Sequence, residues 1–226
     1  MFAVWSQVDW MPLWLTLKVA SIATLVALIF GTAMGYFLAR KQFWGKETLD
    51  ALLTLPMVLP PTVLGYYILS LFGKKGIIGH WLLENFSYTL IFNWHGAVLA
   101  SAIVSYPLVF KSARAAFENV DQEFERVAYT LGQSRLDTFI RITLPLAWRG
   151  ILAGTMLAFA RAMGEFGATL MVAGNIPGRT QTLSLAVYDT VQAGNDPLAD
   201  VLVLITSLVC IAVLVIASRL LKSQHW

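Results

Sequence analysis

Charged residues are scarce in this 226-residue sequence, and their scarcity excludes an ordinary water-soluble fold. Only 13% of the residues are Asp, Glu, Lys or Arg, whereas 58% are hydrophobic. A soluble domain usually carries about twice that charged fraction. Even a compact fold of this length cannot bury so much apolar surface. The solvent for most of this chain is therefore a lipid bilayer.

Cysteine clusters, long basic runs and nucleotide-binding motifs are also missing. Cys210 is the only cysteine, so neither an intrachain disulfide nor a cysteine metal cluster can form. The net charge is +3, and no basic run exceeds a Lys-Lys pair, which argues against nucleic acid as a partner. Without a Walker motif the chain does not hydrolyse ATP itself, and we expect it to bind no cofactor. The first apolar stretch lacks a basic n-region, so no cleavable signal peptide is expected.

Uncharged runs long enough to cross a bilayer occur along the whole chain. A spanning helix needs about 20 apolar residues, and four uncharged runs are near or above this length: residues 19–39, 51–73, 85–110 and 201–218. In the third run, the helix proper is expected to start near Trp94. A fifth run, residues 144–164, contains Arg149 and Arg161 but is otherwise apolar. We therefore expect an all-α integral membrane protein with five transmembrane helices, in which residues 1–226 form a single domain.

The distribution of positive charge predicts the orientation of these helices. Eleven basic residues fall on one side of the membrane: Arg40, Lys41, Lys46, Lys111, Arg114, Arg126, Arg135, Arg141, Arg149, Arg219 and Lys222. Only Lys74, Lys75 and Arg179 fall on the other side. Because cytoplasmic loops collect lysine and arginine, we expect the N-terminus outside the cell and the C-terminus in the cytoplasm.

The longest polar stretch, residues 111–141, is cytoplasmic in this orientation. Four apolar residues recur there at helical spacing and predict a short amphipathic helix: Phe124, Val127, Ala128 and Leu131. Gly132 follows, where a helix C-cap favours a left-handed backbone, and a further turn is expected over residues 134–140. Pro145 then opens the next transmembrane helix, where its missing N–H has no cost. Such a loop can also be a connection that lies on the membrane surface.

A set of residues in and after this loop has a specific spacing: Glu125, Val127, Ala128, Gly132, Ile142, Leu144 and Pro145. The set resembles the cytoplasmic signature loop of bacterial ABC import permeases, over about residues 118–142. Val127 stands where that family usually has alanine. In the family this loop docks into a cleft of the nucleotide-binding subunit, which implies that Glu125 contacts a basic group of that ATPase. A short rigid helix on such a loop acts as a lever on both attached transmembrane helices.

Two other segments supply candidate residues for a translocation pathway. Pro56, Pro60 and Pro61 lie within one span, and each removes a helical hydrogen bond and can kink the helix. A static kink and a hinge are equally compatible with this pattern. Arg161 and Glu165 are four residues apart, so they share a helical face and can form a structural pair.

The segment around that pair is rich in glycine, which permits close helix contact and backbone rearrangement. We therefore predict a gate that includes Gly164, Phe166, Gly167 and Asn175. The polar residues available to meet an anion near this pathway are Thr62, Ser105, Thr169 and Asn175.

Together these segments resemble the molybdate/tungstate permeases, with the sulfate/thiosulfate permeases as close relatives, over about residues 13–221. The resemblance implies the type I ABC importer architecture in a bacterial inner membrane and ATP-driven import of molybdate or tungstate. It also implies a homodimer, two copies of a cytoplasmic ATPase that bind ATP and Mg, and an external protein that delivers the oxyanion.

Three other classes fit the sequence less well. An intramembrane enzyme needs paired aspartates, a Ser/His pair or metal ligands within its spans. No aspartate lies inside a clear span, and His80, His95 and His225 are too dispersed for a metal site. A passive channel needs no cytoplasmic lever, and no filter motif is present. A secondary transporter usually shows internal repeats, which we do not find.

Overall fold

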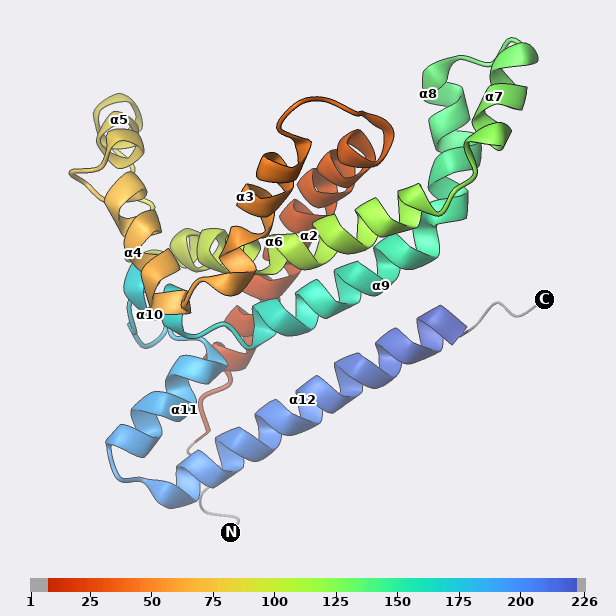
Figure 1. Cartoon of the computed structure of the whole chain (residues 1–226). Helices are drawn as coiled ribbons and strands as arrows, with labels where there is room; N and C mark the ends of the chain where they lie inside the picture. The colour runs from red at the N-terminus through yellow and green to blue at the C-terminus, as the bar shows by residue number, and fades with distance from the viewer. Residues whose placement is uncertain (1–7, 223–226) are drawn as a thin grey trace.

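The computed structural model describes residues 8–222, so His225 lies outside the described residues. Within this range the chain is helical and has no strand, which confirms the predicted all-α class (Figure 1). The helices are α2 (Met11–Arg40), α3 (Lys46–Val58), α4 (Pro61–Phe72), α5 (Ile77–Phe86), α6 (Trp94–Glu118), α7 (Gln122–Thr130), α8 (Arg135–Thr138), the π-helix η1 (Phe139–Thr143), α9 (Leu144–Met163), α10 (Gly167–Ala173), α11 (Leu183–Gln192) and α12 (Asp196–Lys222).

The predicted spans agree with the long helices, with one difference. Within residues 8–222, four helical stretches are long and apolar enough to cross a membrane: Met11–Arg40, Trp94–Glu118, Arg135–Met163 and Asp196–Ile216. The predicted span over residues 51–73 is instead two helices, α3 and α4, with a bend of 112° between them. Pro60 and Pro61 end the α-helical hydrogen bonding there, because neither has an N–H to donate. Counted as one broken span, the bent pair completes the predicted five.

The π-helix η1 joins two helices that the sequence predicts to be separate. Arg135–Met163 is one continuous helix of 29 residues, in which Phe139–Thr143 form a π-helical turn. Pro145 occupies the first turn of α9, as predicted, but the helix does not begin there. A proline inside a helix lacks one backbone hydrogen bond. The π turn lies directly before Pro145, and its backbone hydrogen bonds already differ from the α-helical pattern.

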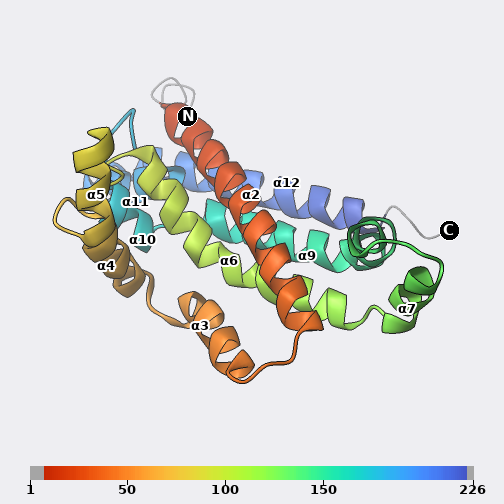
Figure 2. The same ribbon diagram turned by 90° about the horizontal axis from the view of Figure 1, so that it is seen from above.

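Helix α6 packs against both α2 and α9, and these three helices form the centre of the molecule (Figure 2). Glycines hold the contacts close. A Cβ added to Gly35 of α2 would lie 2.9 Å from the backbone nitrogen of Arg114. A Cβ added to Gly154 of α9 would lie 2.4 Å from the Cβ of Ser112. Each glycine has a second glycine four residues earlier, Gly31 or Gly150, so both helices carry the small-xxx-small pattern of membrane helix contacts.

The remaining helices lie around this centre. Helix α12 packs on α11 and α9 at one edge, and only 17% of its most apolar stretch is buried. Helices α3, α4 and α5 lie at the opposite edge, where α4 packs on α10 and α3 contacts α6 (Figure 2). Helix α3 has no buried residue, so its packing on the bundle is loose.

We expect Gly154→Ala to destabilise the protein by about 1–3 kcal/mol, because the new methyl group overpacks the contact between α6 and α9. Thermal unfolding in detergent, followed by the reaction of the single cysteine Cys210 with a fluorescent maleimide, measures the effect. Gly164→Ala is the matched control, because a Cβ there would have no neighbour closer than 3.8 Å. Equal unfolding temperatures for the two variants would contradict the proposed packing.

Candidate functional site

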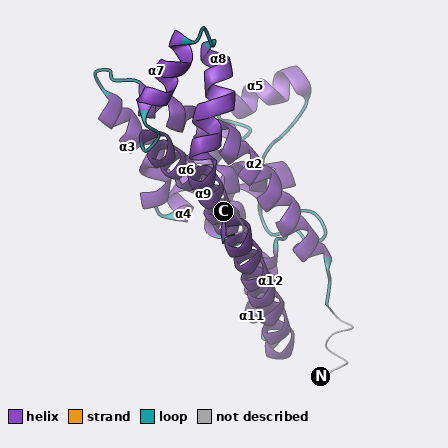
Figure 3. Ribbon diagram, turned by 90° about the vertical axis from the view of Figure 1, so that its right-hand side faces the viewer, coloured by secondary structure: helices purple, strands orange, loops and turns teal. Residues whose placement is uncertain are grey.

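Helices α7 and α8 form a hairpin that projects at one end of the molecule (Figures 1 and 3). The continuous helix Arg135–Met163 has 29 residues. At 1.5 Å per residue it is about 44 Å long, roughly 14 Å more than the hydrocarbon core of a bilayer. Its first turns, and α7 beside them, therefore extend beyond the hydrocarbon.

Both ends of α7 are closed by hydrogen bonds. At the start, the Asp121 carboxylate accepts a hydrogen bond of 2.9 Å from the backbone N–H of Glu123. At the end, Gly132 has a φ of +81°. There the N–H of Gly132 donates to the Tyr129 carbonyl at 3.0 Å, and that of Gln133 donates to the Ala128 carbonyl at 3.1 Å. This is the Schellman arrangement, so the predicted left-handed C-cap is confirmed.

The carboxylate of Glu125 is held inside the chain. Its Oε1 accepts hydrogen bonds from Nε of Arg40 at 3.1 Å, from Nη2 of Arg40 at 2.8 Å and from Oγ1 of Thr143 at 2.8 Å. The side chains of Arg40 and Glu125 are each only 10% exposed. Within the chain, Glu125 therefore forms an internal ion pair, and its predicted contact with a basic group of an ATPase stays a prediction. A buried carboxylate needs a charged partner, and Arg40 at the end of α2 supplies it.

Three aromatic rings pack near this ion pair. The centroid of Tyr36 in α2 lies 5.2 Å from that of Phe117 in α6 and 4.7 Å from that of Phe139 in η1. Edge-on pairs at these distances stabilise packing beyond the area that they bury. Leu144 is half-buried against the same cluster. The base of the hairpin is thus bound to α2, α6 and α9 together.

The outer face of α7 is apolar and exposed. Phe124, Val127 and Leu131 are 55%, 49% and 75% exposed, whereas Ala128 is buried. These residues border an open hollow of about 630 Å³ between α7 and the α8–η1 segment, and Ile142 also lines it. The predicted amphipathic helix is confirmed, but most of its apolar face points outward. An apolar surface beyond the hydrocarbon indicates a protein partner.

The two predicted pathway segments meet where α4 packs on α10. A Cβ added to Gly167 would lie 2.9 Å from the Cβ of Pro61, and one added to Gly65 would lie 2.6 Å from the Cβ of Met171. The bend between α3 and α4 therefore packs directly on the glycine-rich segment. Pro60 is exposed and precedes the first residue of α4. Pro56 lies inside α3, where it lines an apolar crevice between α3, α2 and α6.

Arg161 and Glu165 form the predicted ion pair, with Nη1 and Oε2 separated by 2.8 Å. The other oxygen of the buried Glu165 accepts a hydrogen bond of 2.9 Å from the N–H of Ala168, in the first turn of α10. The carboxylate thus joins the end of α9, where Gly164 is the C-cap, to the start of α10. The ring of Phe166 lies 5.1 Å from that of Tyr188 in α11.

The four polar residues predicted to meet an anion differ in their surroundings. The hydroxyl of Ser105 donates to the Ser101 carbonyl at 2.7 Å, so it is already engaged. Thr62 is exposed on α4. Among the described residues, Oγ1 of Thr169 and Oδ1 of Asn175 are buried atoms without a hydrogen-bond partner. Between residues 8 and 222, no three His, Cys, Asp or Glu residues are grouped as metal ligands.

A second ionic cluster, which the sequence reasoning missed, holds α3 to α6. The carboxylate of Asp50 pairs with Lys111 and, at 2.5 Å, with Arg114. Arg114 also pairs with Glu118 at 2.8 Å. Asp50 is 61 residues from Lys111 and 64 from Arg114, so no local spacing could reveal these contacts.

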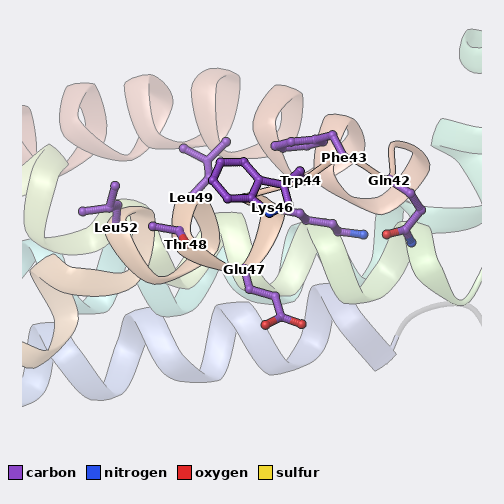
Figure 4. Close-up of a pocket in the computed structure, with 9 residues that line it drawn as sticks. Gln42, Phe43, Trp44, Lys46, Glu47, Thr48, Leu49 and Leu52 are labelled. Atoms are coloured by element: carbon purple, nitrogen blue, oxygen red, sulfur yellow. The ribbon is translucent and has the colours of Figure 1, made fainter.

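The connection between α2 and α3 borders another open hollow, of about 740 Å³ (Figure 4). Its residues include Phe43, Trp44, Lys46 and Glu47, and Trp44 is fully exposed. An exposed tryptophan between lysines is typical of a membrane interface. The hollow contains charges of both signs, which makes it a poor anion site.

Comparison with known proteins gives a consistent result. Residues 15–224 match the family described as "Binding-protein-dependent transport system inner membrane component". The chain is 44% identical over 209 residues to the molybdenum transport system permease protein ModB of Escherichia coli strain K12, covering 92% of this chain and 91% of that protein. It is 36% identical over 185 residues to the sulfate transport system permease protein CysT of the same strain, covering 82% of this chain and 66% of that protein.

Among solved structures, the fold is similar to that of a chain of the MetNI methionine ABC transporter in an inward-facing conformation. The TM-score is 0.74, with 15% sequence identity and 94% of each chain covered. At this identity the likeness concerns the fold alone.

We expect Arg40→Gln to loosen α7, because the substitution leaves the buried carboxylate of Glu125 without its charged partner. Breaking a buried pair costs about 3 kcal/mol or more, so amide hydrogen exchange over Gln122–Thr130 should become roughly a hundredfold faster. Arg126→Gln is the matched control, because the Arg126 side chain is 72% exposed and lies 3.8 Å from Glu123. Unchanged exchange in Arg40→Gln would show that the ion pair does not hold α7.

Proposed function

The chain belongs to the family of binding-protein-dependent transport system inner membrane components, and from this membership we propose that it is the membrane-spanning subunit of an ABC importer that brings molybdate or tungstate into the cytoplasm. As a permease it is a transport subunit and not an ATPase. ATP and Mg bind to a separate cytoplasmic subunit, present in two copies. The whole chain acts as one permease domain.

The observation that carries this proposal is the apolar tip of α7. Phe124, Val127 and Leu131 are exposed on a capped, rigid helix that extends beyond the hydrocarbon. A cleft in the ATPase covers this surface, since an apolar patch in water favours a protein contact. Ala128 and Gly132 support the surface from within, the first by packing and the second by closing the helix.

Glu125 couples the tip to the membrane helices. When the ATPase moves α7, the ion pair with Arg40 transmits the force to α2, and the hydrogen bond with Thr143 transmits it to η1 and α9. Ile142, Leu144 and Pro145 form the rearranged turn and the start of α9, so this movement tilts α9 as a lever.

The gate lies where the bend between α3 and α4 meets α10. Pro56, Pro60 and Pro61 let α3 swing against α4, while Gly164 and Gly167 allow α9 and α10 to follow. Arg161 and Glu165 keep those two helices connected. Two copies of the chain enclose one pathway, and exposed aromatic residues of α4, Tyr66 and Tyr67, lie on the apolar surface available to the second copy.

The orientation follows from the position of α7. The ATPase is cytoplasmic, so the hairpin end faces the cytoplasm of a bacterial cell and the N-terminus lies outside. An external oxyanion-binding protein delivers the substrate to the opposite end. Identity to the molybdenum permease exceeds identity to the sulfate permease, 44% against 36%, which favours molybdate. A sulfate or thiosulfate importer is the second candidate.

We expect Val127→Glu to reduce uptake at least about tenfold while the protein stays in the membrane, because burying an unpaired carboxylate at the ATPase contact costs several kcal/mol. Uptake and ATP hydrolysis by the purified transporter in liposomes measure the effect. Gln122→Glu is the control: it adds the same charge to the first turn of α7, away from the apolar surface. If the Val127→Glu variant took up substrate at the wild-type rate, α7 would not be the surface that couples transport to the ATPase.

We expect cells to require this chain for the uptake of radiolabelled molybdate, and a large excess of sulfate to leave that uptake nearly unchanged. The comparison uses a strain that lacks the chain and the same strain with the chain restored. Uptake that sulfate abolishes would assign the importer to the sulfate relatives. Uptake that does not depend on the chain would exclude molybdate as the substrate.

A further inference from the structure

A second polar hollow, of about 390 Å³, is bordered by the start of α2, which lies at the end of the molecule opposite the α7–α8 hairpin (Figure 1). Three segments that are distant in sequence border it: the start of α2, residues 92–94 at the start of α6, and residues 178–180 after α10. Trp14 and Lys18 come from α2, Trp94 begins α6, and Arg179 projects from the loop. Neither the coupling mechanism nor the gate uses these residues.

The two cations of this hollow have no anionic partner among residues 8–222. Lys18 has its Nζ 3.6 Å from the ring centroid of Trp94, a cation–π contact that holds the ammonium in place. No carboxylate within the part of the chain that the structure describes lies within 4.0 Å of Lys18 or Arg179. Two positive charges in one concavity create a field that attracts an anion.

The walls of the hollow are fixed before any ligand arrives. The Thr180 hydroxyl accepts a hydrogen bond of 3.0 Å from the N–H of Ile176, which closes the turn that presents Arg179. The N–H of Leu183 donates to Thr16 of α2 at 2.8 Å. The N–H of Phe92 donates to the carbonyl of Val172 at 2.9 Å. These three bonds attach the loop and the start of α6 to their neighbours, so the site is largely preorganised.

We propose that this hollow binds a tetrahedral oxyanion group, with phosphate as the simplest example. The ammonium of Lys18 and the guanidinium of Arg179 supply charged donors suited to such oxygens. Trp14 is exposed beside them and gives an apolar rim of the kind found at membrane interfaces. The group can come from a phospholipid headgroup or from a free oxyanion in water. The inference does not rest on the transport substrate or on the coupling role of α7.

Two binding measurements on the assembled transporter distinguish the sources. Native mass spectrometry counts the phosphatidylglycerol molecules that remain bound after extraction from mixed phosphatidylglycerol and phosphatidylcholine membranes. Calorimetry in nanodiscs of phosphatidylcholine alone measures the affinity for orthophosphate and for molybdate. We expect Arg179→Gln to weaken one of these affinities roughly fivefold, and Lys18→Gln/Arg179→Gln roughly 25-fold. The double variant Lys18→Arg/Arg179→Gln keeps a positive charge at position 18, so its affinity should be about that of Arg179→Gln alone.

The control is Lys74→Gln/Lys75→Gln, which removes two exposed cations from the loop between α4 and α5. Arg179 is itself exposed, so Arg179→Gln leaves the fold intact. Loss of lipid retention in the Lys18 and Arg179 variants alone identifies a headgroup site, and loss of orthophosphate or molybdate affinity alone identifies a free-oxyanion site. Binding that is undetectable in the wild type, unchanged in these variants or equally reduced in the control would overturn the inference. Molybdate uptake is measured in a separate experiment, so a negative binding result would contradict this inference without contradicting the proposed function.

Discussion

The close approach of α2 and α9 to α6 is the constraint on which the rest of the structure depends. In a bilayer, helices gain little from burying apolar side chains against one another, because lipid is equally apolar. Gly35 and Gly154 instead let backbones and short side chains meet, with no space for even one added carbon. This contact sets how α2 and α9 lie relative to α6. Arg40 and Thr143 are thereby brought to the same place, on the two sides of Glu125.

Burying Glu125 makes the hairpin a rigid extension of the bundle. A buried ion pair contributes little net stability, because desolvation offsets most of the attraction. Its geometry is demanding, however, and one oxygen here receives three donor atoms from two helical segments. Rotation of α7 alone would break all three bonds at once. A partner that displaces the apolar tip must therefore displace α2 and α9 with it.

The sequence predicts those features that depend on local spacing. Hydropathy locates the spans, the apolar periodicity and Gly132 locate α7 and its cap, and the four-residue separation of Arg161 and Glu165 predicts their pair. Local spacing does not predict contacts between distant segments, such as the ion pair of Glu125 with Arg40, which is 85 residues away in the sequence. For the same reason Glu125 is interpreted from sequence as an outward contact. The prolines predict a kink, but the bend of 112° depends on the packing of α4 on α10, which no local rule contains.

The fold divides into a rigid part and a part that can rearrange. Around Glu125 one carboxylate oxygen accepts three hydrogen bonds, and three aromatic rings pack at the base of the hairpin. Helix α3 is different: it buries no residue, Asp50 holds one end to α6, and the proline break frees the other. Segments with few buried contacts are the first to move when force is applied. In the proposed mechanism, force applied at α7 therefore passes through the central helices and is relieved at the α3–α4 bend, which packs on α10 beside the buried, unpaired hydroxyl of Thr169.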